Sequence, residues 1–409
     1  MARFLIAWEC GEGLGHIIPI AQVATHLISR GHRVDVVLAD MSSGRIAFGA
    51  LLDSPALSLW QAPTWRLALV GSRAPLSLVE LLFQVGFLDA QRLSMLVRGW
   101  LSIIRAVGPD AILVEHAPTA LLAARVARVP TLVFGPGFFI PPKTQPIPSF
   151  AEWLPLDVAR INEGERVFVA TCNAVLQELD GQPIKSASEL WSTSQCLLTT
   201  LPELDHYGKF RDGDARYIGF PALPLGGGHP AWPRGDAFHV AVYLKAGYAQ
   251  ALEVLKSLVT MKLATVAFVP GILPGDQRAL ACETLCISEQ PLDMAAVMQE
   301  SNLFITNGGA GVTGAAVRAG VPLLVLPTQA EQFITARRVV ALKVGLALLE
   351  EEVADQIKAA VQRIQSEPQF RDNARKLMRH ALLNNGEQAC HRIADAAVAL
   401  VGGPSVTSC

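Results

Sequence analysis

Charged residues are scarce in this 409-residue chain, and neither sign is in excess. Asp, Glu, Lys and Arg make up 17% of the residues, against about 25% in ordinary globular proteins, and the formal net charge is −2. Without a basic surplus the chain is poorly suited to neutralise a phosphate backbone, which argues against nucleic-acid binding. Hydrophobic residues make up 51%. This content excludes general disorder and requires large cores, or an apolar surface for an apolar partner.

The chain also lacks the uninterrupted run of about 18 apolar residues that a membrane-spanning helix needs. The closest candidate, residues 67–88, is broken by Arg73 and Glu80. The apolar run within the first ten residues is too short for a signal peptide and is followed by no small-residue cleavage site. We therefore expect a cytoplasmic protein without a transmembrane span, and leave peripheral membrane contact through a local patch open.

Paired cysteines are missing as well. The seven cysteines are dispersed and none forms a CxxC pair; they lie at positions 10, 172, 196, 282, 286, 390 and 409. This pattern argues against a disulfide framework and against a structural zinc site, so we expect reduced thiols.

Short apolar runs alternate with helical periodicity along both halves of the chain. Residues 3–8 and 33–39 are predicted strands, and between them apolar residues recur at the three-and-four spacing of a helix from Ile17 to Ile28. Further predicted strands are 111–115, 131–135, 238–244, 265–269, 303–306 and 323–326, and predicted helices are 119–128, 249–260, 312–318, 353–366, 370–383 and 387–400. Such alternation predicts parallel sheets covered by helices.

A stretch rich in glycine and proline separates the two halves. Nine of the 17 residues from 219 to 235 are Gly or Pro, which predicts a linker. We expect an α/β protein of two facing, doubly wound, Rossmann-like domains with a cleft between them. The expected parts are a domain over 1–218, a linker over 219–236, a domain over 237–383 and a helix over 384–401 that could return to the first domain.

The loop Gly11-Glu12-Gly13-Leu14-Gly15-His16 follows the first predicted strand and opens a helix. A dinucleotide-binding fingerprint would need its third glycine where His16 stands, so that interpretation is disfavoured. Gly13 and Gly15 instead let the backbone and a ligand approach closely, while His16 points from the helix start toward the cleft.

A histidine at this place could remove a proton from a bound hydroxyl, because imidazole titrates near neutrality. Glu115 ends a predicted strand at the same edge of the sheet and could orient the second ring nitrogen. His116 is a less favoured substitute for either residue. The alternative is that His16 is a capping or core residue and Glu115 a solvated acid.

A second glycine motif, Thr306-Asn307-Gly308-Gly309-Ala310-Gly311-Val312-Thr313, lies between a predicted strand and helix. Backbone N–H groups at such a helix start suit a phosphate or diphosphate without any basic side chain. Glu331 and Gln332 follow the next strand, and an acid beside an amide is suited to bind sugar hydroxyls. The alternative is an ordinary turn and a surface acid.

The stretches GEGLGHIIP and TNGGAGVTGAAVRAGVPLLVLPTQAEQ resemble two-domain glycosyltransferases of the GT-B type. The resemblance is strongest to the family-1, UDP-glycosyltransferase-like group that includes bacterial natural-product glycosyltransferases, and it covers nearly the whole chain. It implies an acceptor-binding first domain and a nucleotide-sugar-binding second domain.

The resemblance also implies roles for single residues. His16 would be the general base and Glu115 its supporting acid, and residues 307–312 would hold the diphosphate. Glu331 and Gln332 would hold the sugar, Pro291 and Leu292 would meet the base, and the loop with Gly247 would close over the nucleotide. Transfer would invert the anomeric carbon, with no metal and no cofactor beyond the nucleotide diphosphate sugar.

Four positions depart from the family pattern. Asn307 replaces a histidine and could still donate to a phosphate, Val312 replaces a threonine, Ala315 replaces the acid that holds the ribose, and Glu115 stands where aspartate is commoner. Losing a charge-assisted hydrogen bond costs about 1.5–3 kcal/mol. The donor nucleotide is therefore either UDP or dTDP. The missing acid would weaken the binding of dTDP less, because its sugar is a deoxyribose.

Aromatic residues gather in the least regular parts of the first half, residues 65–105 and 136–155. Phe83, Phe87, Phe138 and Phe139 are predicted to line an apolar acceptor pocket; the alternative is that they belong to the core.

The sequence thus predicts an inverting glycosyltransferase that acts on a small hydrophobic acceptor. The rival hypotheses are a non-catalytic GT-B relative that binds a nucleotide or serves as a partner subunit, and a nicotinamide-dependent oxidoreductase.

Overall fold

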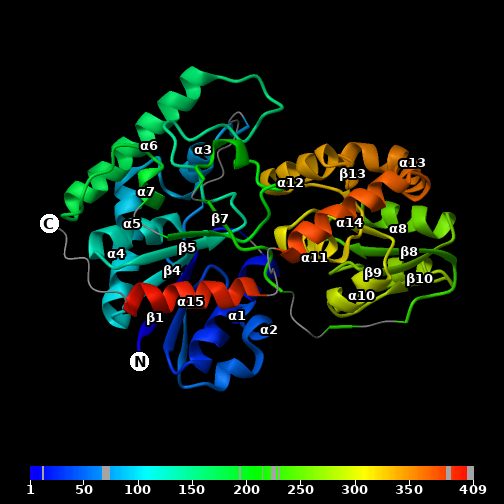
Figure 1. Cartoon of the computed structure of the whole chain (residues 1–409), viewed down its shortest axis with the longest axis horizontal. Coiled ribbons are helices and arrows are strands. Elements are labelled where there is room, and N and C mark those ends of the chain that lie inside the picture. Colours follow the sequence, from blue (N-terminus) through cyan, green and yellow to red (C-terminus); the bar gives the residue numbers. More distant parts are fainter. Residues whose placement is uncertain are drawn as a thin grey trace. The chain divides into compact units, whose positions relative to one another are not determined.

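The structure of the chain is a computed structural model that describes residues 1–402 apart from 12, 67–73, 193–194, 214, 223–226, 229–230 and 384–387. The chain divides into two compact units (Figure 1). The amino-terminal unit comprises Met1–Thr200, Asp205–Ile218 and the chain from Gln388 onward, and the carboxy-terminal unit comprises Leu201–Leu204 and Gly219–Glu387. The last helix therefore belongs to the amino-terminal unit.

Within the described residues, the amino-terminal unit has a seven-stranded parallel sheet in the order β3-β2-β1-β4-β5-β6-β7. Its strands are β1 (Arg3–Trp8), β2 (Arg33–Leu38), β3 (Leu57–Gln61), β4 (Ala111–Glu115), β5 (Thr131–Gly135), β6 (Gln195–Leu198) and β7 (Arg216–Tyr217). The strand order reverses between β1 and β4, where Trp8 pairs with Glu115. Open parallel sheets bind ligands at such a switch point, beyond the carboxyl ends of the strands.

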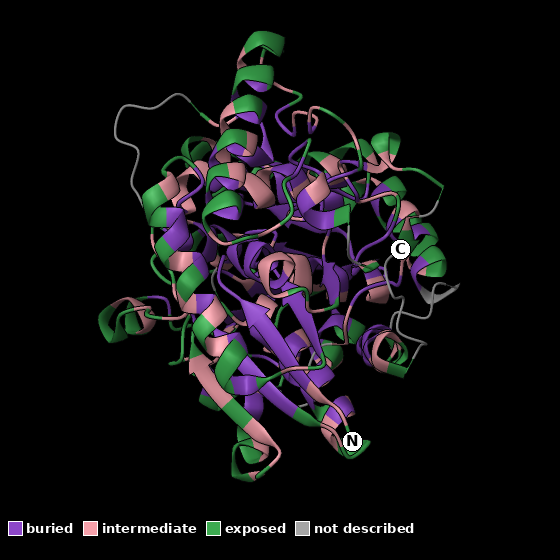
Figure 2. Ribbon diagram, turned by 90° about the vertical axis from the view of Figure 1, so that its left-hand side faces the viewer, coloured by how far each residue is buried: buried purple, intermediate pink, exposed green. Residues whose placement is uncertain are grey.

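Helices cover both faces of this sheet. They are α1 (Leu14–Ser29), α2 (Gly44–Phe48), α3 (Leu78–Leu82), α4 (Ala90–Val107), α5 (Pro118–Ala127), α6 (Val158–Glu178), α7 (Glu189–Ser192) and α15 (Ala389–Gly402). Alternate residues of β1 enter two cores, because successive strand side chains point to opposite faces. Phe4 and Ile6 pack with α1 and α15, whereas Leu5 and Ala7 pack with α4, α5 and α6. The central strands β1, β2, β4 and β5 are accordingly buried from both sides (Figure 2), whereas the edge strands β3 and β7 are partly exposed.

The carboxy-terminal unit repeats this plan with a six-stranded parallel sheet in the order β10-β9-β8-β11-β12-β13, counted over its described residues. The strands are β8 (Asp236–Tyr243), β9 (Leu263–Phe268), β10 (Leu285–Ile287), β11 (Leu303–Thr306), β12 (Leu323–Val325) and β13 (Gly345–Ala347). The helices are α8 (Ala251–Thr260), α9 (Pro274–Ala279), α10 (Met294–Glu300), α11 (Ala310–Ala319), α12 (Ala330–Ala341), α13 (Val353–Ser366) and α14 (Pro368–Leu383). α8 and α13 cover one face, and α10, α11 and α14 cover the other.

The predicted α/β architecture of two parallel sheets is confirmed, and β4, β5, β11 and α13 have their predicted bounds. The expectation of irregular chain over 65–105 is wrong for α4, which occupies residues 90–107. Asp89 caps this helix by accepting hydrogen bonds from the backbone N–H groups of Gln91 and Arg92, and Gly108 ends it in the left-handed conformation. The two residues that begin and end the helix, Asp89 and Gly108, were visible in the sequence, and apolar residues recur at helical spacing between them.

Parts of four predicted segments lie outside the described residues: residue 12 of the first glycine loop, 67–73 of the interrupted apolar stretch, 223–226 and 229–230 of the linker, and 384–387 of the last predicted helix. Among the helices that the structure describes, none combines the length and the apolar character needed to cross a membrane. The cysteines of the described chain form no disulfide.

Candidate functional site

The first predicted pair of site residues meets at the switch point of the amino-terminal sheet. Glu115 is the last residue of β4, and β4 lies directly beside β1. The loop after β1 leads into α1, in which His16 is the third residue. Because parallel strands end at the same edge of the sheet, this loop and the end of β4 come together.

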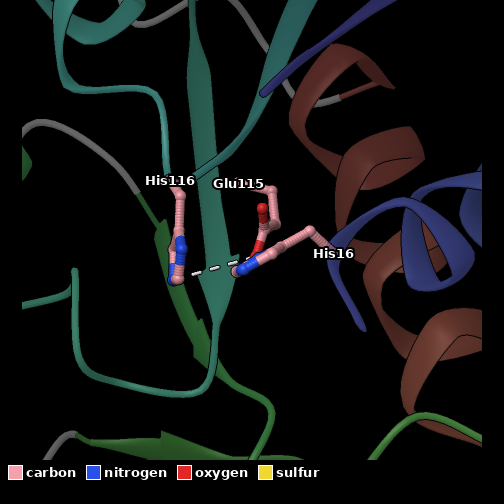
Figure 3. A group of neighbouring side chains, drawn as sticks. All are labelled: His16, Glu115 and His116. Atoms are coloured by element: carbon pink, nitrogen blue, oxygen red, sulfur yellow. Dashed lines mark hydrogen bonds and ion pairs between the residues drawn. The ribbon is translucent and has the colours of Figure 1, made fainter. Parts of the chain in front are cut away.

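His16 Nδ1 and Glu115 Oε1 lie 3.0 Å apart, within hydrogen-bond distance (Figure 3). The His16 side chain is 13% exposed and the Glu115 side chain 4%, so the bond is largely shielded from water. An ionised carboxylate accepts only, which assigns the proton to Nδ1 and leaves Nε2 as the basic nitrogen. The Trp8 ring stacks on the imidazole with 5.8 Å between centroids. The ring is therefore held in one orientation from its edge and from its face.

Gly11 lies against the basic nitrogen. Its φ is +92°, and a Cβ atom at this position would stand 2.4 Å from His16 Nε2. Glycine is required here both for the backbone conformation and for the close approach of the imidazole. Gly13 (φ +84°) is the residue before α1, and Gly15 lies in its first turn; in the described part of the chain, a Cβ at either would meet no atom within 4 Å.

His116 completes a group of three side chains. Its ring centroid lies 4.6 Å from that of His16, and its Nε2 lies 3.8 Å from Glu115 Oε1 (Figure 3). His116 has a φ of 45° and is 3% exposed, and its backbone oxygen accepts a hydrogen bond from Cys10 N. Burial and, secondly, the neighbouring His16 lower the pKa of His116 well below its ordinary value, so the ring is neutral. From the sequence, His116 was a less favoured substitute for either residue; in the structure it lies close to both.

A second carboxylate, Glu9, lies buried directly after β1 and was missed by the sequence analysis. It accepts hydrogen bonds from Trp100 Nε1 at 2.9 Å, from Thr119 N at 2.7 Å and from the Thr119 hydroxyl. Burial raises its pKa to about 7, an effect that these donors partly offset. Glu9 thus joins the end of β1 to α4 and to the start of α5. The sequence signal for such a residue was an acid placed directly after a predicted buried strand.

The four predicted acceptor-binding aromatics divide into two pairs. Phe87 is fully buried and stacks on Phe168 with 4.9 Å between centroids, so it belongs to the core, the alternative that the sequence left open. Phe83 is half-buried and packs against the same core. Phe139, in contrast, lies 4.2 Å from the His116 ring, and Phe138 lies 4.9 Å from Phe139, both measured between centroids. Of the four predicted aromatics, Phe139 therefore adjoins His116, and Phe138 packs against Phe139.

In the carboxy-terminal unit, the second glycine motif forms the turn from β11 into α11. Gly308 has a φ of +89°, and its missing Cβ would stand 2.6 Å from Val325 Cγ1. Gly309 precedes α11 and offers no capping side chain, and no acid lies in the first turn of the ten-residue helix, which contains Ala310, Gly311 and Val312. The N–H groups at this helix start suit an anion.

Asn307 has a structural role that the sequence analysis did not foresee. Its Oδ1 accepts from Lys245 N and its Nδ2 donates to Leu326 O, both at 2.8 Å. The side chain is 4% exposed and ties the chain after β8 and the end of β12 to the glycine turn. Gln332 acts similarly, because its Oε1 accepts from both the N–H and the hydroxyl of Thr328, at 3.0 and 2.9 Å.

The remaining predicted donor residues lie on loops and at a helix start of the same unit. Gly247 (φ +69°) is in the turn after β8, and Glu331 is in the first turn of α12. Leu292 is buried and forms an isolated parallel bridge with Gly228, whose N–H donates to Pro291 O at 2.7 Å. Several of the predicted residues thus gather around the carboxyl ends of β8, β11 and β12.

Known glycosyltransferases resemble this chain in part of its sequence and in its fold. Residues 287–396 match the family model "Erythromycin biosynthesis protein CIII-like, C-terminal domain". NDP-glycosyltransferase YjiC of Bacillus subtilis (strain 168) is 35% identical over 91 residues, which are 22% of this chain and 23% of YjiC. The aligned segment thus spans less than a quarter of that curated relative.

Solved structures share the fold over the whole length. The glycotransferase of kitacinnamycin has a TM-score of 0.71 at 18% identity, covering 98% of this chain and 99% of its own. Spinosyn rhamnosyltransferase SpnG, solved in complex with thymidine diphosphate, has a TM-score of 0.66 at 18% identity, covering 97% and 100%. The predicted resemblance is confirmed: the chain has the GT-B fold of glycosyltransferases, and its residues 287–396 match the EryCIII-like C-terminal domain.

Proposed function

We propose that this protein transfers a sugar from a nucleotide diphosphate sugar to a hydroxyl group of a small hydrophobic acceptor. The observation that carries the proposal is the 3.0 Å hydrogen bond between His16 Nδ1 and Glu115 Oε1. It assigns the lone pair to Nε2, which can then take the proton of an acceptor hydroxyl as the oxygen attacks the anomeric carbon. Attack from the face opposite the leaving diphosphate inverts that carbon.

The carboxy-terminal unit would hold the donor at the glycine turn before α11. The leaving diphosphate gains negative charge, and the N–H groups at the start of α11 would stabilise it without a metal ion. Thymidine diphosphate in the SpnG structure supports a dTDP-sugar as the donor. Ala315 also favours dTDP over UDP, because a methyl group cannot bind the ribose 2′-hydroxyl that only UDP carries.

Phe138 and Phe139 are proposed to contact the acceptor, since Phe139 lies beside His116 and Phe138 packs against Phe139. Their apolar rings favour an acceptor with an apolar body. Phe87 is left out of this role because it is buried in the core.

The test is transfer by the full chain with dTDP- and UDP-sugars and a panel of hydrophobic alcohols and phenols, with chelator added throughout. We expect products of inverted anomeric configuration by NMR. His16→Ala and Glu115→Gln should each lower kcat by about 10²–10⁴-fold, because the first removes the base and the second its orienting charge. His239→Gln, far along the chain in β8, is the matched histidine control and should transfer at the normal rate.

Near-normal transfer by His16→Ala would eliminate the proposed base. Tight binding of dTDP or UDP in calorimetry, with no transfer to any acceptor of the panel, would instead favour a nucleotide-binding partner protein.

A further inference from the structure

The group around Glu115 contains more buried polar atoms than its own contacts satisfy. Among the described residues, Glu115 Oε2 and both ring nitrogens of His116 have no hydrogen-bond partner. The His116 side chain is 1% exposed and that of Glu115 4%, so bulk water does not replace the missing partners. A buried polar group without a partner costs about 1–3 kcal/mol, and such groups in a folded protein call for an explanation.

Imidazole nitrogens and a carboxylate oxygen are also atoms that bind metal ions. One ligand atom each from His16, Glu115 and His116 lies within 4.8 Å of the other two. The two measured separations from Glu115 Oε1 are 3.0 Å to His16 Nδ1 and 3.8 Å to His116 Nε2. Neighbouring ligands of a tetrahedral zinc ion, with bonds of about 2.0–2.1 Å, lie roughly 3.3 Å apart. The two distances lie on either side of that value, so binding requires His16 and Glu115 to separate slightly and His116 to move closer.

The three side chains also point toward one another from different elements (Figure 3). His16 comes from α1, Glu115 ends β4, and His116 follows it with its φ of 45°. This conformation is uncommon for residues other than glycine and lets two consecutive residues contribute to one group. Two imidazoles and one carboxylate leave the fourth position of a tetrahedral ion open, as in many catalytic zinc sites.

We propose that His16, Glu115 and His116 bind one divalent ion of the zinc class, and that this ion turns off the His16 base. Nδ1 can bind a metal only through a lone pair, so its proton must leave, and in a neutral imidazole that proton moves to Nε2. No net proton is released. Nε2 nevertheless loses the lone pair that would take the proton from the hydroxyl group of the sugar-accepting substrate. The ion also takes the Glu115 oxygen that held the ring.

Imidazole ligands make the site selective for zinc, copper or nickel over magnesium and calcium, which prefer oxygen. Magnesium should therefore leave the protein unaffected. The metal site goes beyond the proposed function and does not depend on it. The predicted loss of sugar transfer, in contrast, rests on the proposed function.

The binding test uses the untagged full chain and needs no sugar substrate. Cobalt(II) added to the chelator-treated protein should give visible absorption of a four-coordinate complex at one ion per chain, and zinc should displace it. Calorimetry with zinc chloride gives the affinity. His116→Gln should weaken zinc binding at least tenfold, and Glu115→Gln likewise, while the control His239→Gln, outside the group, should bind as the unmodified chain does.

Circular dichroism and thermal unfolding check that each variant is folded, and His116→Asn serves if His116→Gln is not. Unchanged zinc affinity in the folded His116 variant, or binding of less than one cobalt ion per chain, overturns the site.

The second arm measures transfer and rests on the proposed function. Zinc at a saturating concentration should abolish transfer, chelator should restore it, and His116→Gln should retain more of its own rate in zinc than the unmodified chain does. Sugar transfer that persists when zinc fills the site would contradict the proposal that the ion inactivates the His16 base. If no transfer occurs under any condition, the proposed function fails, whereas the binding arm still decides the metal site.

Discussion

Gly11 and His16 share one small space: the imidazole Nε2 occupies the region where any other residue at position 11 would place its Cβ, 2.4 Å away. The pair therefore sets the position of the nitrogen to which we assign the base. Glu115 holds the other side of the same ring.

Replacing Gly11 should consequently damage the site more than the fold. In Gly11→Ala the new methyl group must displace the His16 ring, which breaks the 3.0 Å bond to Glu115. We expect kcat for transfer to fall about 10²–10⁴-fold, the contribution of a positioned base.

Gly31→Ala is the matched control. Gly31 has a φ of +81°, and in the described chain no atom lies within 4 Å of its missing Cβ. It should lose about 1–2 kcal/mol of stability from backbone strain and keep its kcat. Equal kcat values for the two variants would contradict the contact between Gly11 and His16.

The side chain of Asn307 should matter for both stability and nucleotide binding. Asn307→Asp keeps an acceptor for Lys245 N but loses the donor to Leu326 O and adds a charge beside the glycine turn. We expect a loss of about 1–3 kcal/mol in the free energy of unfolding. Calorimetry should show dTDP and UDP binding at least tenfold more weakly, because like charges repel. An unchanged free energy of unfolding would show that the hydrogen bond from Asn307 to Leu326 O is unimportant.

Phe220 explains why a glycine lies inside α11. A Cβ at Gly314 would stand 2.6–2.9 Å from atoms of the Phe220 side chain, which is 4% exposed. Gly314→Ala should therefore destabilise the protein by about 1–3 kcal/mol in chemical denaturation, although alanine favours helices. Gly275→Ala in α9, where described neighbours leave the Cβ position open, should instead gain up to about 1 kcal/mol. A stabilising Gly314→Ala would refute the packing argument.

Glu9 should make stability fall as the pH rises. Its pKa is about 7 in the folded protein against an ordinary 4.5, because burial disfavours the charged form. Below about pH 4.5 the carboxyl is protonated in both states; between about pH 4.5 and 7 only the unfolded chain ionises, which favours unfolding. The loss amounts to about 3 kcal/mol and is complete above about pH 7.

Denaturation of the unmodified chain and of Glu9→Gln across about pH 5–8 isolates this contribution. In Glu9→Gln, the free energy of unfolding should lack the part of its pH dependence that comes from Glu9, whatever the absolute stability of the variant. The control Glu163→Gln, on the exposed face of α6, should retain that part. Parallel pH profiles for Glu9→Gln and the unmodified chain would contradict the raised pKa.

Local sequence patterns determined the architecture and the main candidates of this protein. Alternating apolar runs and helical periodicity predicted the two parallel sheets, because a strand buried on both faces and a helix buried on one must place apolar residues at those spacings. The same reasoning placed His16 after one strand and Glu115 at the end of another, and adjacent parallel strands end together. It failed for α4, where the signals at both ends of the helix were overlooked.

Only the tertiary structure decided what each side chain touches. It buried Phe87 in a core and left Phe139 beside His116, it engaged Asn307 with two backbone groups, and it brought Glu9 to Thr119. These contacts join residues far apart in sequence, and spacing along a chain carries no information about the distance or direction of such partners. The same applies to His116: its place after Glu115 was plain in the sequence, but only the folded chain buries its two ring nitrogens without a hydrogen-bond partner among the described residues.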